Sequence, residues 1–228
     1  MIAPVNGGII MRGRAMAMDS TVLSEGRNST KACVRLIRLA GETVVEKDYS
    51  SRSFLVRGIL GPRLLDREEG ALRRLDGLSG VPGFKLRPSR QRLIMERLPG
   101  RSLASYPRGG DGTTLPPDFF LRLRRLVKAV HHEGIAQGDI GAGDVLVRSD
   151  GSPGLVDFSV SVRRRSGGFR GWLYRSAVYQ DLRRIARLHQ RYSPIDLDAE
   201  EERILAAEPP AHRWSRRLRR LLPGRRRP

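Results

Sequence analysis

The stretch His131–Ser159 decides the fold and reads HHEGIAQGDIGAGDVLVRSDGSPGLVDFS. It carries three aspartates at fixed intervals: Asp139, Asp144 five residues on, and Asp157 thirteen residues further. Two short apolar runs, VLV and GLV, flank a polar turn and predict a β-hairpin between the second and third aspartates. A loop aspartate and two aspartates at the ends of a hairpin can converge on one point. Convergent carboxylates suit Mg²⁺ and phosphate chemistry, because Mg²⁺ takes a few carboxylate oxygens together with substrate phosphates.

The spacing is that of a protein kinase catalytic loop followed by its metal-binding aspartate, D-x-x-x-x-N and then D-F-G. In this chain the pattern reads Asp139-x-x-x-x-Asp144, followed by D-F-S from Asp157. The segment therefore resembles the protein-kinase-like superfamily. It is most similar to the small bacterial RIO-type and lipopolysaccharide (Kdo/heptose) kinase-like proteins. Those proteins read roughly H-G-D-L-x-x-x-N, and this chain shares their glycine as Gly138.

The resemblance implies a bilobal α+β fold, with a small β-rich N-lobe that contains one helix and a mainly helical C-lobe. It implies an enzyme that uses ATP and Mg²⁺ to move the γ-phosphate to a hydroxyl. Asp139 would be the catalytic base, and Asp144 and Asp157 would hold Mg²⁺. The segment around Glu96 and Leu98 falls where a hinge would meet adenine, through backbone groups.

Lys47 and Glu68 form the other half of the expected site. Lys47 shares one face of the predicted strand 43–49 with Val45, and a lysine on an inward face needs a charged partner. Glu68 lies within an apolar stripe of the predicted helix 62–75, where a carboxylate is costly unless it is paired. An ion pair between them answers both problems, and in the family such a pair holds the lysine against nucleotide phosphates. The alternative is an ordinary strand-edge lysine and a solvated helix charge.

Three residues of the motif depart from the family pattern. Gln137 stands where a histidine is expected, Asp144 replaces the asparagine, and Ser159 replaces the glycine of D-F-G and restricts the backbone there. Aspartate can bind Mg²⁺, but it adds negative charge near ATP and cannot donate an amide hydrogen bond. No good G-x-G-x-x-G precedes Lys47. These departures motivate a second function class, a catalytically weak or inactive pseudokinase that acts as a binding module.

Asp181 opens an amphipathic pattern in a helix expected over 178–191, and it has two interpretations. In the resemblance an aspartate on this helix braces the catalytic loop, whereas a helix N-cap is an equally good role. His131 and His132 end a helix predicted from Asp118 and lack the spacing of metal ligands, so we interpret them as caps or solvated residues.

Strands and one helix come first in the chain, and helices dominate afterwards, which fits two lobes. The predicted strands are 32–39, 43–49 and 91–98, and the predicted helices are 62–75, 118–132, 178–191 and 199–207. The expected division is an irregular N-terminal segment over 1–30, an N-lobe over 31–98, a C-lobe over 99–210 and a basic C-terminal tail over 211–228.

The charge of the chain is extreme, because 43 Lys and Arg residues face 24 Asp and Glu residues for a net charge of +19. Such a surface attracts polyanions, whether phosphate-rich substrates, anionic lipid or nucleic acid. A compositional bias toward arginine is the alternative explanation. A nucleic-acid-binding protein is a third function class, but specific nucleic acid is disfavoured. Aromatic residues make up only 6% of the chain and show no regular spacing for base stacking.

Arginines gather in two segments. Residues 213–228 hold eight arginines with Trp214 and leucines, which predicts peripheral contact with an anionic membrane, with a solvated tail as the alternative. Five more arginines lie between Arg163 and Arg175, where an acceptor would dock. They suit a phosphorylated or acidic acceptor. The resemblance implies as acceptor either a Ser/Thr protein or an anionic sugar of the lipopolysaccharide core.

Composition also restricts the compartment. The chain has no run of about 18 apolar residues, the minimum for a membrane-spanning helix, so no span is expected. The single cysteine, Cys33, excludes an intrachain disulfide and fits a reducing compartment as a small apolar strand residue. We therefore expect a cytoplasmic protein that can associate peripherally with the inner membrane.

Overall fold

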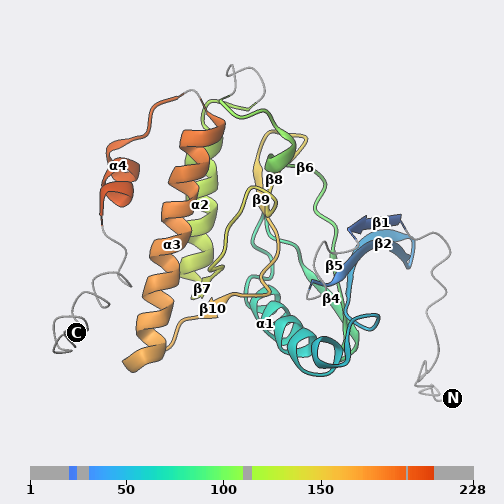
Figure 1. Ribbon diagram of the computed structural model, residues 1–228. Coiled ribbons are helices and arrows are strands. Elements are labelled where there is room, and N and C mark those ends of the chain that lie inside the picture. The colour runs from blue at the N-terminus through green and yellow to red at the C-terminus, as the bar shows by residue number, and fades with distance from the viewer. Residues whose placement is uncertain (1–20, 25–30, 110–114, 194, 208–228) are drawn as a thin grey trace, which may run out of the picture.

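The computed structural model of the chain describes residues 21–24, 31–109, 115–193 and 195–207 (Figure 1). Two lobes are visible: an antiparallel sheet with one helix, and a second lobe dominated by long helices. The expected bilobal α+β fold is therefore confirmed. The basic C-terminal tail over 211–228 lies outside the described residues.

The N-lobe is a five-stranded antiparallel sheet with the strand order β1-β2-β3-β5-β4. Its strands are β1 (Thr21–Ser24), β2 (Cys33–Leu39), β3 (Glu42–Asp48), β4 (Phe84–Ser89) and β5 (Arg92–Glu96). Strands β2 and β3 form a hairpin whose turn, Ala40 and Gly41, separates the predicted strands 32–39 and 43–49, and both turn residues have positive φ. Cys33 is a buried free thiol in β2, as the sequence predicted.

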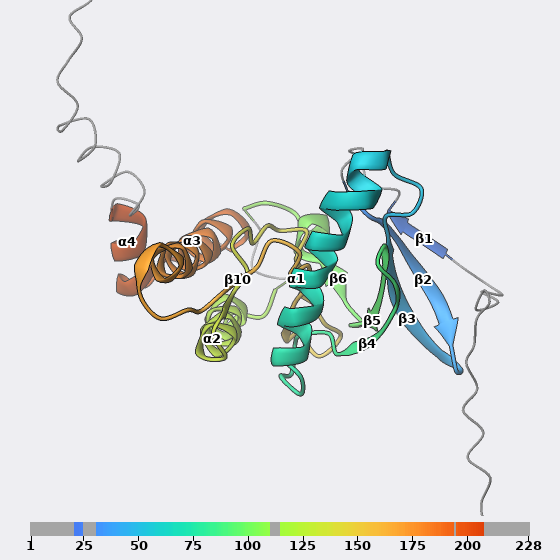
Figure 2. The ribbon, with the colours of Figure 1, turned by 90° about the horizontal axis from the view of Figure 1, so that it is seen from below.

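Helix α1 (Gly61–Arg74) follows a π-helical turn, η1 (Val56–Leu60), and lies between the sheet and the helical lobe (Figure 2). Its buried side includes Glu68, Ala71 and Leu72, which belong to the predicted apolar stripe, so that stripe lies on the face that packs inward. Leu93 and Met95 lie on the sheet face that carries Lys47, and both belong to the main core. The helix therefore presents Glu68 to the same side of the sheet as Lys47.

Two strands of the sheet escaped prediction. Residues 21–24, expected to be irregular, form β1, which only its pairing with β2 reveals, because four residues carry no usable period. Strand β4 contains Pro88 and two basic residues, Lys85 and Arg87, which weaken the strand signal. It lies at the edge of the sheet, where a missing N–H costs no ladder hydrogen bond.

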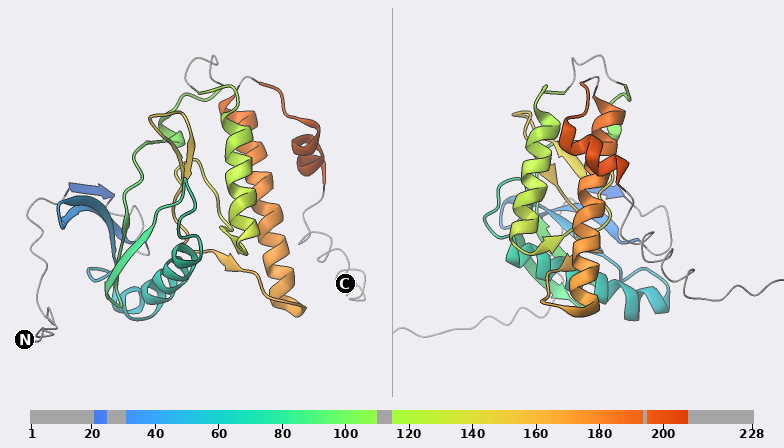
Figure 3. Two further views of the ribbon diagram at one scale, coloured as in Figure 1. Left: turned by 180° about the vertical axis from the view of Figure 1, so that it is seen from behind. Right: turned by 90° about the vertical axis from the view of Figure 1, so that its left-hand side faces the viewer.

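The C-lobe is built on two long helices, α2 (Phe119–His132) and α3 (Gly168–Tyr192), that lie side by side (Figure 3). Helix α3 begins well before the expected start at 178, because Gly168 and Gly171 in its first turn weaken the helix signal. The shorter elements are β6 (Arg101–Ser102), η2 (Leu103–Ser105), β7 (Ile135–Ala136), β8 (Val145–Val147), β9 (Pro153–Leu155), β10 (Val162–Arg163) and α4 (Ala199–Ala206). Among the described helices, none has the length and apolar content needed to span a bilayer.

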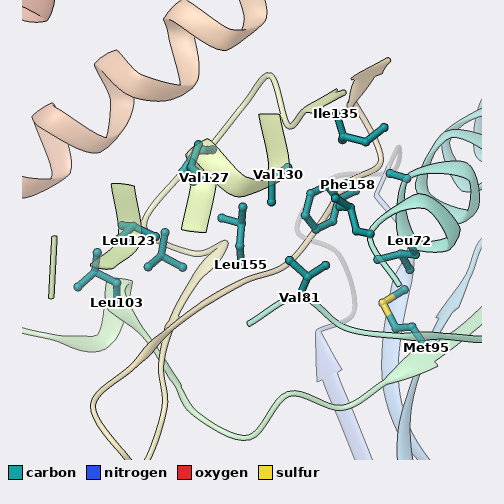
Figure 4. Close-up of a cluster of buried hydrophobic side chains, with 14 of the residues drawn as sticks. Leu72, Val81, Met95, Leu103, Leu123, Val127, Val130, Ile135, Leu155 and Phe158 are labelled. Carbon is teal, nitrogen blue, oxygen red and sulfur yellow. The ribbon is translucent and has the colours of Figure 1, made fainter. Parts of the chain in front are cut away.

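One hydrophobic core joins the two lobes. Phe158 is fully buried and lies between Leu72 of α1 and Val130 of α2 (Figure 4). The same cluster includes Met95 of β5 and Leu155 of β9. Because Phe158 follows Asp157 directly, this packing fixes the backbone that carries the third aspartate.

The packing of α1 against the sheet lobe depends on the absence of a side chain at Gly61, where a Cβ atom would lie 2.6 Å from Cγ of Tyr49. We expect Gly61→Ala to lower the free energy of unfolding by about 1–3 kcal/mol, the usual cost of overpacking. Gly70→Ala in the same helix is the matched control, because a Cβ atom there would meet nothing within 4 Å. That variant should gain up to about 1 kcal/mol from helix propensity. Urea unfolding measures both values, and equal effects at the two glycines would contradict this account of the packing.

Candidate active site

Lys47 lies at the centre of the candidate site, between carboxylates from the two lobes. Its Nζ lies 2.6 Å from Glu68 Oε1 on α1 and 3.0 Å from Asp157 Oδ1 beyond β9. Only 12% of the Lys47 side chain is exposed, and none of the Glu68 side chain. The predicted Lys47–Glu68 ion pair is confirmed, and the alternative of an ordinary strand-edge lysine and a solvated helix charge is wrong. Asp157 is a second partner that the sequence did not predict.

Burial and charge compete in this cluster. Burial disfavours the charged form of Lys47, but Glu68 and Asp157 outweigh it and raise the pKa of the lysine. Burial also raises the pKa of Glu68, while the charge of Lys47 acts in the opposite direction. Burial acts to raise the pKa of Asp157 as well, yet Lys47 and Ser159 prevail and lower it to about 2. Lys47 is therefore cationic and Asp157 anionic at neutral pH.

The D-F-S turn is held by hydrogen bonds from both sides. Glu68 Oε1 accepts the N–H of Phe158 at 3.3 Å, which ties α1 to the turn. The Ser159 hydroxyl donates to Asp157 Oδ1 at 2.7 Å, and its N–H donates to the same oxygen at 3.3 Å. The strained backbone lies at Asp157, with φ of +66°, rather than at Ser159. Serine in the place of glycine thus orients the aspartate and imposes no strain on its own backbone.

Asp181 braces the loop that carries Asp139. This carboxylate is fully buried in the middle of α3 and accepts the N–H groups of Gln137 and Gly138, both at 2.8 Å. The Nε2 atom of His131 lies 3.0 Å from Asp181 Oδ2, the oxygen that also accepts the N–H of Gln137. The bracing interpretation is confirmed, and the N-cap interpretation is wrong because α3 begins at Gly168. The interpretation of His131 as a cap or solvated residue is also wrong, since its ring contacts Asp181.

Gln137 takes over the anchoring position where a histidine was expected. Its side-chain amide donates to the carbonyl oxygens of Val156 at 2.8 Å and Asp157 at 2.9 Å. Its backbone meanwhile donates to Asp181. One glutamine therefore connects the loop before Asp139 to the segment that carries Asp157, because an amide with two N–H groups can serve two carbonyls.

Asp139 lies at the surface, where Arg184 of α3 contacts it. The Arg184 Nη2 to Asp139 Oδ1 distance is 2.7 Å, and the two side chains are 43% and 63% exposed. Arg184 also donates to the carbonyl of Ile140 at 3.4 Å. Sequence reasoning missed Arg184. Its spacing of three residues from Asp181 is the signal that places it on the same helix face, beside the loop.

Asp144 is close to Asp157 through the hairpin. Its carbonyl accepts the N–H of Val156 at 2.9 Å, and its Oδ2 accepts the N–H of Gly141 at 2.9 Å. Burial raises the pKa of Asp144 to about 6, and the negative charge of Asp157 adds to this effect. The negative charges of Asp144 and Asp157 thus act on one another, and a bound cation would relieve this repulsion.

The residues present fit a magnesium ion that is completed by phosphate. Within the described ranges, no group of three or more His, Cys, Asp and Glu side chains is arranged to hold a metal ion. Asp144 Oδ1 and Asp157 Oδ2 make no hydrogen bond with other described residues, so each acid retains a free oxygen. Mg²⁺ characteristically takes one or two carboxylates and fills its other positions with water and substrate phosphates. Asp144 and Asp157 are the residues that would hold it.

The predicted hinge residues lie in the connection between the lobes. Glu96 ends β5, its side chain is exposed, and its N–H is already donated to the carbonyl of Gly83 at 2.8 Å. The Glu96 carboxylate accepts the N–H of Gly83 at 2.9 Å and lies on the sheet face opposite Lys47. Leu98 is half buried, and its backbone makes no hydrogen bond with other described residues. Adenine contact by these two residues stays a prediction.

The fold recurs in solved structures, among them the crystal structure of the Rio2 kinase from Chaetomium thermophilum. The two chains superpose with a TM-score of 0.54 at 16% sequence identity, over 80% of this chain and 63% of that chain. The fold is protein-kinase-like. This chain thus spans less than two thirds of the length of that Rio2 kinase. No protein-family model and no curated protein matches the sequence. At this identity the protein-kinase-like fold is the shared property.

The brace at Asp181 generates a stability prediction. We expect Asp181→Asn to lower the free energy of unfolding by at least about 2 kcal/mol, because a buried ionic acceptor of several N–H groups is lost. Asp66→Asn is the control, since Asp66 pairs with Arg87 at 3.0 Å while its side chain is 69% exposed. It should change stability by less than about 1 kcal/mol. Denaturant unfolding compares the two, and a loss below 1 kcal/mol at Asp181 would refute the brace.

Proposed function

We propose that this protein is a kinase-like phosphotransferase that uses Mg-ATP to phosphorylate a hydroxyl group. The observation that carries the proposal is Lys47, held cationic between Glu68 and Asp157 in a protein-kinase-like fold. An ammonium fixed in this way presents one rigid positive charge to nucleotide phosphates. Asp139, on a loop braced by Asp181, supplies an exposed carboxylate to the same region.

The proposed reaction assigns one role to each residue. Lys47 binds the phosphates of ATP, Glu68 positions Lys47, and Asp144 and Asp157 hold Mg²⁺. Asp139 accepts the proton of the acceptor hydroxyl while the oxygen of that hydroxyl forms a bond to the γ-phosphorus. The bond from that phosphorus to the β–γ bridging oxygen breaks, and its electrons leave with ADP. Bound Mg²⁺ would supply neutralisation of phosphate charge. Leu98 and Glu96 would line the adenine end.

We infer a relation to the small RIO-type and lipopolysaccharide kinase-like proteins from the Gln-Gly-Asp loop around Gly138 and from the Rio2 kinase likeness. The proposed acceptor is a Ser/Thr protein or an anionic sugar of the lipopolysaccharide core. The net charge of +19 supports an anionic acceptor. A cytoplasmic protein that contacts the inner membrane through the tail 211–228 is part of this proposal.

A pseudokinase that binds nucleotide without transfer is the second candidate. Two observations favour it. Asp144 replaces the amide of the family, and burial, with the negative charge of Asp157 added to it, raises the pKa of its carboxyl to about 6. Asp139 is engaged by Arg184, which competes with an acceptor hydroxyl for the carboxylate.

Phosphate transfer from labelled ATP separates these candidates. We expect the full chain with Mg-ATP to label casein, lipopolysaccharide core or itself. Asp139→Asn should lower the rate by about 10²–10⁴-fold, the usual contribution of a general base, and leave ATP affinity within about threefold. Lys47→Met should weaken ATP binding. Lys85→Met is its control, because Lys85 is a more exposed strand lysine paired with Glu42 at 2.9 Å. Lys85→Met should leave the rate of phosphate transfer and the affinity for ATP unchanged. Binding of Mg-ATP with no transfer to any acceptor would favour the pseudokinase.

Arg184 is the residue whose role divides the candidates most sharply. We expect Arg184→Gln to lower kcat by about tenfold or more and leave the KM for ATP unchanged, because a cation beside the base stabilises charge that develops in transfer. Arg184→Lys should restore part of the rate. Stability should change by less than about 1 kcal/mol, since the Arg184–Asp139 pair is exposed. Steady-state kinetics of the three proteins measures this, and a rise in kcat for Arg184→Gln would identify the pair as inhibitory.

A further inference from the structure

Four arginines surround a hollow of about 980 Å³ between the D-F-S turn and the body of α3. We define the arginine hollow by its lining side chains: Arg163, Arg164, Arg165, Arg170 and Phe169. All five residues are exposed. In sequence they begin six residues after Asp157, so the hollow belongs to the segment that connects the candidate active site to α3.

The arginines of the hollow have no acidic partner in the described part of the chain. Several other arginines of this chain do have one. Examples are Arg87 with Asp66 and Glu69, Arg92 with Glu46, and Arg124 with Asp198. The hollow differs from the remaining arginines that have no acidic partner, because four of its guanidinium groups line one hollow. Four neighbouring like charges repel one another, so the hollow favours an anion that would neutralise them.

The hollow is held rigidly to the loop that carries Asp139. Val162 and Arg163 of β10 pair with Ala136 and Ile135 of β7, which lead directly into that loop. The N–H of Arg164 donates to the carbonyl of Gly134 at 2.7 Å. These backbone contacts fix the position of the arginines relative to Asp139, as docking of an acceptor requires.

An apolar surface lies beside these charges. Phe169 is 71% exposed and stacks on Trp172, with ring centroids 5.7 Å apart. The Tyr174 hydroxyl donates to the carbonyl of His131 at 2.7 Å, which holds the start of α3 against the end of α2. The stacked pair gives the uncharged part of a ligand, such as a sugar ring, a flat apolar contact next to the arginines.

We propose that the arginine hollow binds a phosphate group already present on the acceptor, at a position distinct from the hydroxyl that receives the new phosphate. That the bound molecule is the acceptor of phosphotransfer rests on the proposed function. Binding of a phosphate group in the hollow does not depend on that function. Phosphate suits the hollow better than a carboxylate, because its three oxygens can each accept from a different guanidinium fork. The phosphate belongs to a soluble phosphorylated sugar or to a lipid headgroup, which share this chemistry.

Calorimetric titration of the full chain without nucleotide tests the proposal at physiological salt. The probes are glucose 6-phosphate, glucose, and vesicles of phosphatidylglycerol or phosphatidylcholine. We expect binding of at least one phosphate-bearing anionic probe and none of glucose or phosphatidylcholine. The variant Arg163→Glu/Arg165→Glu/Arg170→Glu should weaken that binding about tenfold or more. Binding of glucose 6-phosphate identifies a soluble source, and binding confined to phosphatidylglycerol identifies a lipid headgroup.

A charge-matched control isolates position from bulk charge. Arg125→Glu/Arg187→Glu/Arg191→Glu changes three exposed arginines elsewhere on the helices and should alter binding by less than about twofold. The corresponding Arg→Gln triple at the hollow guards against misfolding and should also weaken binding. Equal losses in the two Glu triples, or no binding of any phosphate-bearing probe, would overturn the proposal.

The variant Asp139→Asn distinguishes a failure of the arginine hollow from a failure of the proposed function. We expect this variant to bind the phosphate probe like the unchanged protein. If the unchanged protein binds the probe but transfers no phosphate to any acceptor, only the proposed function is refuted. Phosphotransfer that is insensitive to the Glu triple at the hollow, together with absent probe binding, would refute only the arginine hollow.

Discussion

A buried ammonium group imposes the main constraint on this structure. Lys47 is almost entirely inside the protein, where an unpaired charge would be prohibitive. Its two partners come from different lobes: Glu68 from the helix of the N-lobe and Asp157 from the segment that follows the hairpin of the C-lobe. Neutralising one charge therefore requires both lobes to meet in one arrangement. The apolar packing of Phe158, next to Asp157, stabilises the same arrangement.

A second buried polar network fixes the catalytic loop candidate. Asp181 collects two backbone N–H groups and a histidine ring, and Gln137 connects that loop to the carbonyls next to Asp157. The network explains how the chain tolerates glutamine in place of histidine: the amide satisfies two carbonyl oxygens that would otherwise be unpaired. The departures from the family motif are therefore compensated structurally at Gln137 and Ser159. At Asp144 the N–H of Gly141 and the charge of Lys47 do not outweigh burial, and the pKa of the carboxyl is raised to about 6.

The positive charge of the protein is organised in two ways. Many arginines are bound to acids and stabilise the architecture, as Arg124 does between α2 and α4 and Arg92 does on the outer face of the sheet. The arginines from β10 to the start of α3 are different, because they gather around one hollow near the proposed site of transfer and pair with no acid in the described part of the chain. Arg184 differs from both groups, since its acidic partner among the described residues is Asp139 itself. The phosphate site proposed at the arginine hollow therefore depends on a few arginines and not on the total charge.

The sequence by itself determined the features that local periodicity records. The apolar stripe around Glu68 predicted both α1 and the need for a cation, and the three aspartates with their apolar runs predicted the hairpin and the loop. The tertiary structure alone decided contacts between distant segments. Asp181 had two equally good roles until α3 was seen to begin at Gly168, and the pairing of Arg184 with Asp139 depends on a helix far along the chain. Periodicity reports which face of an element is buried, whereas the partner across the interface is set by how whole elements pack.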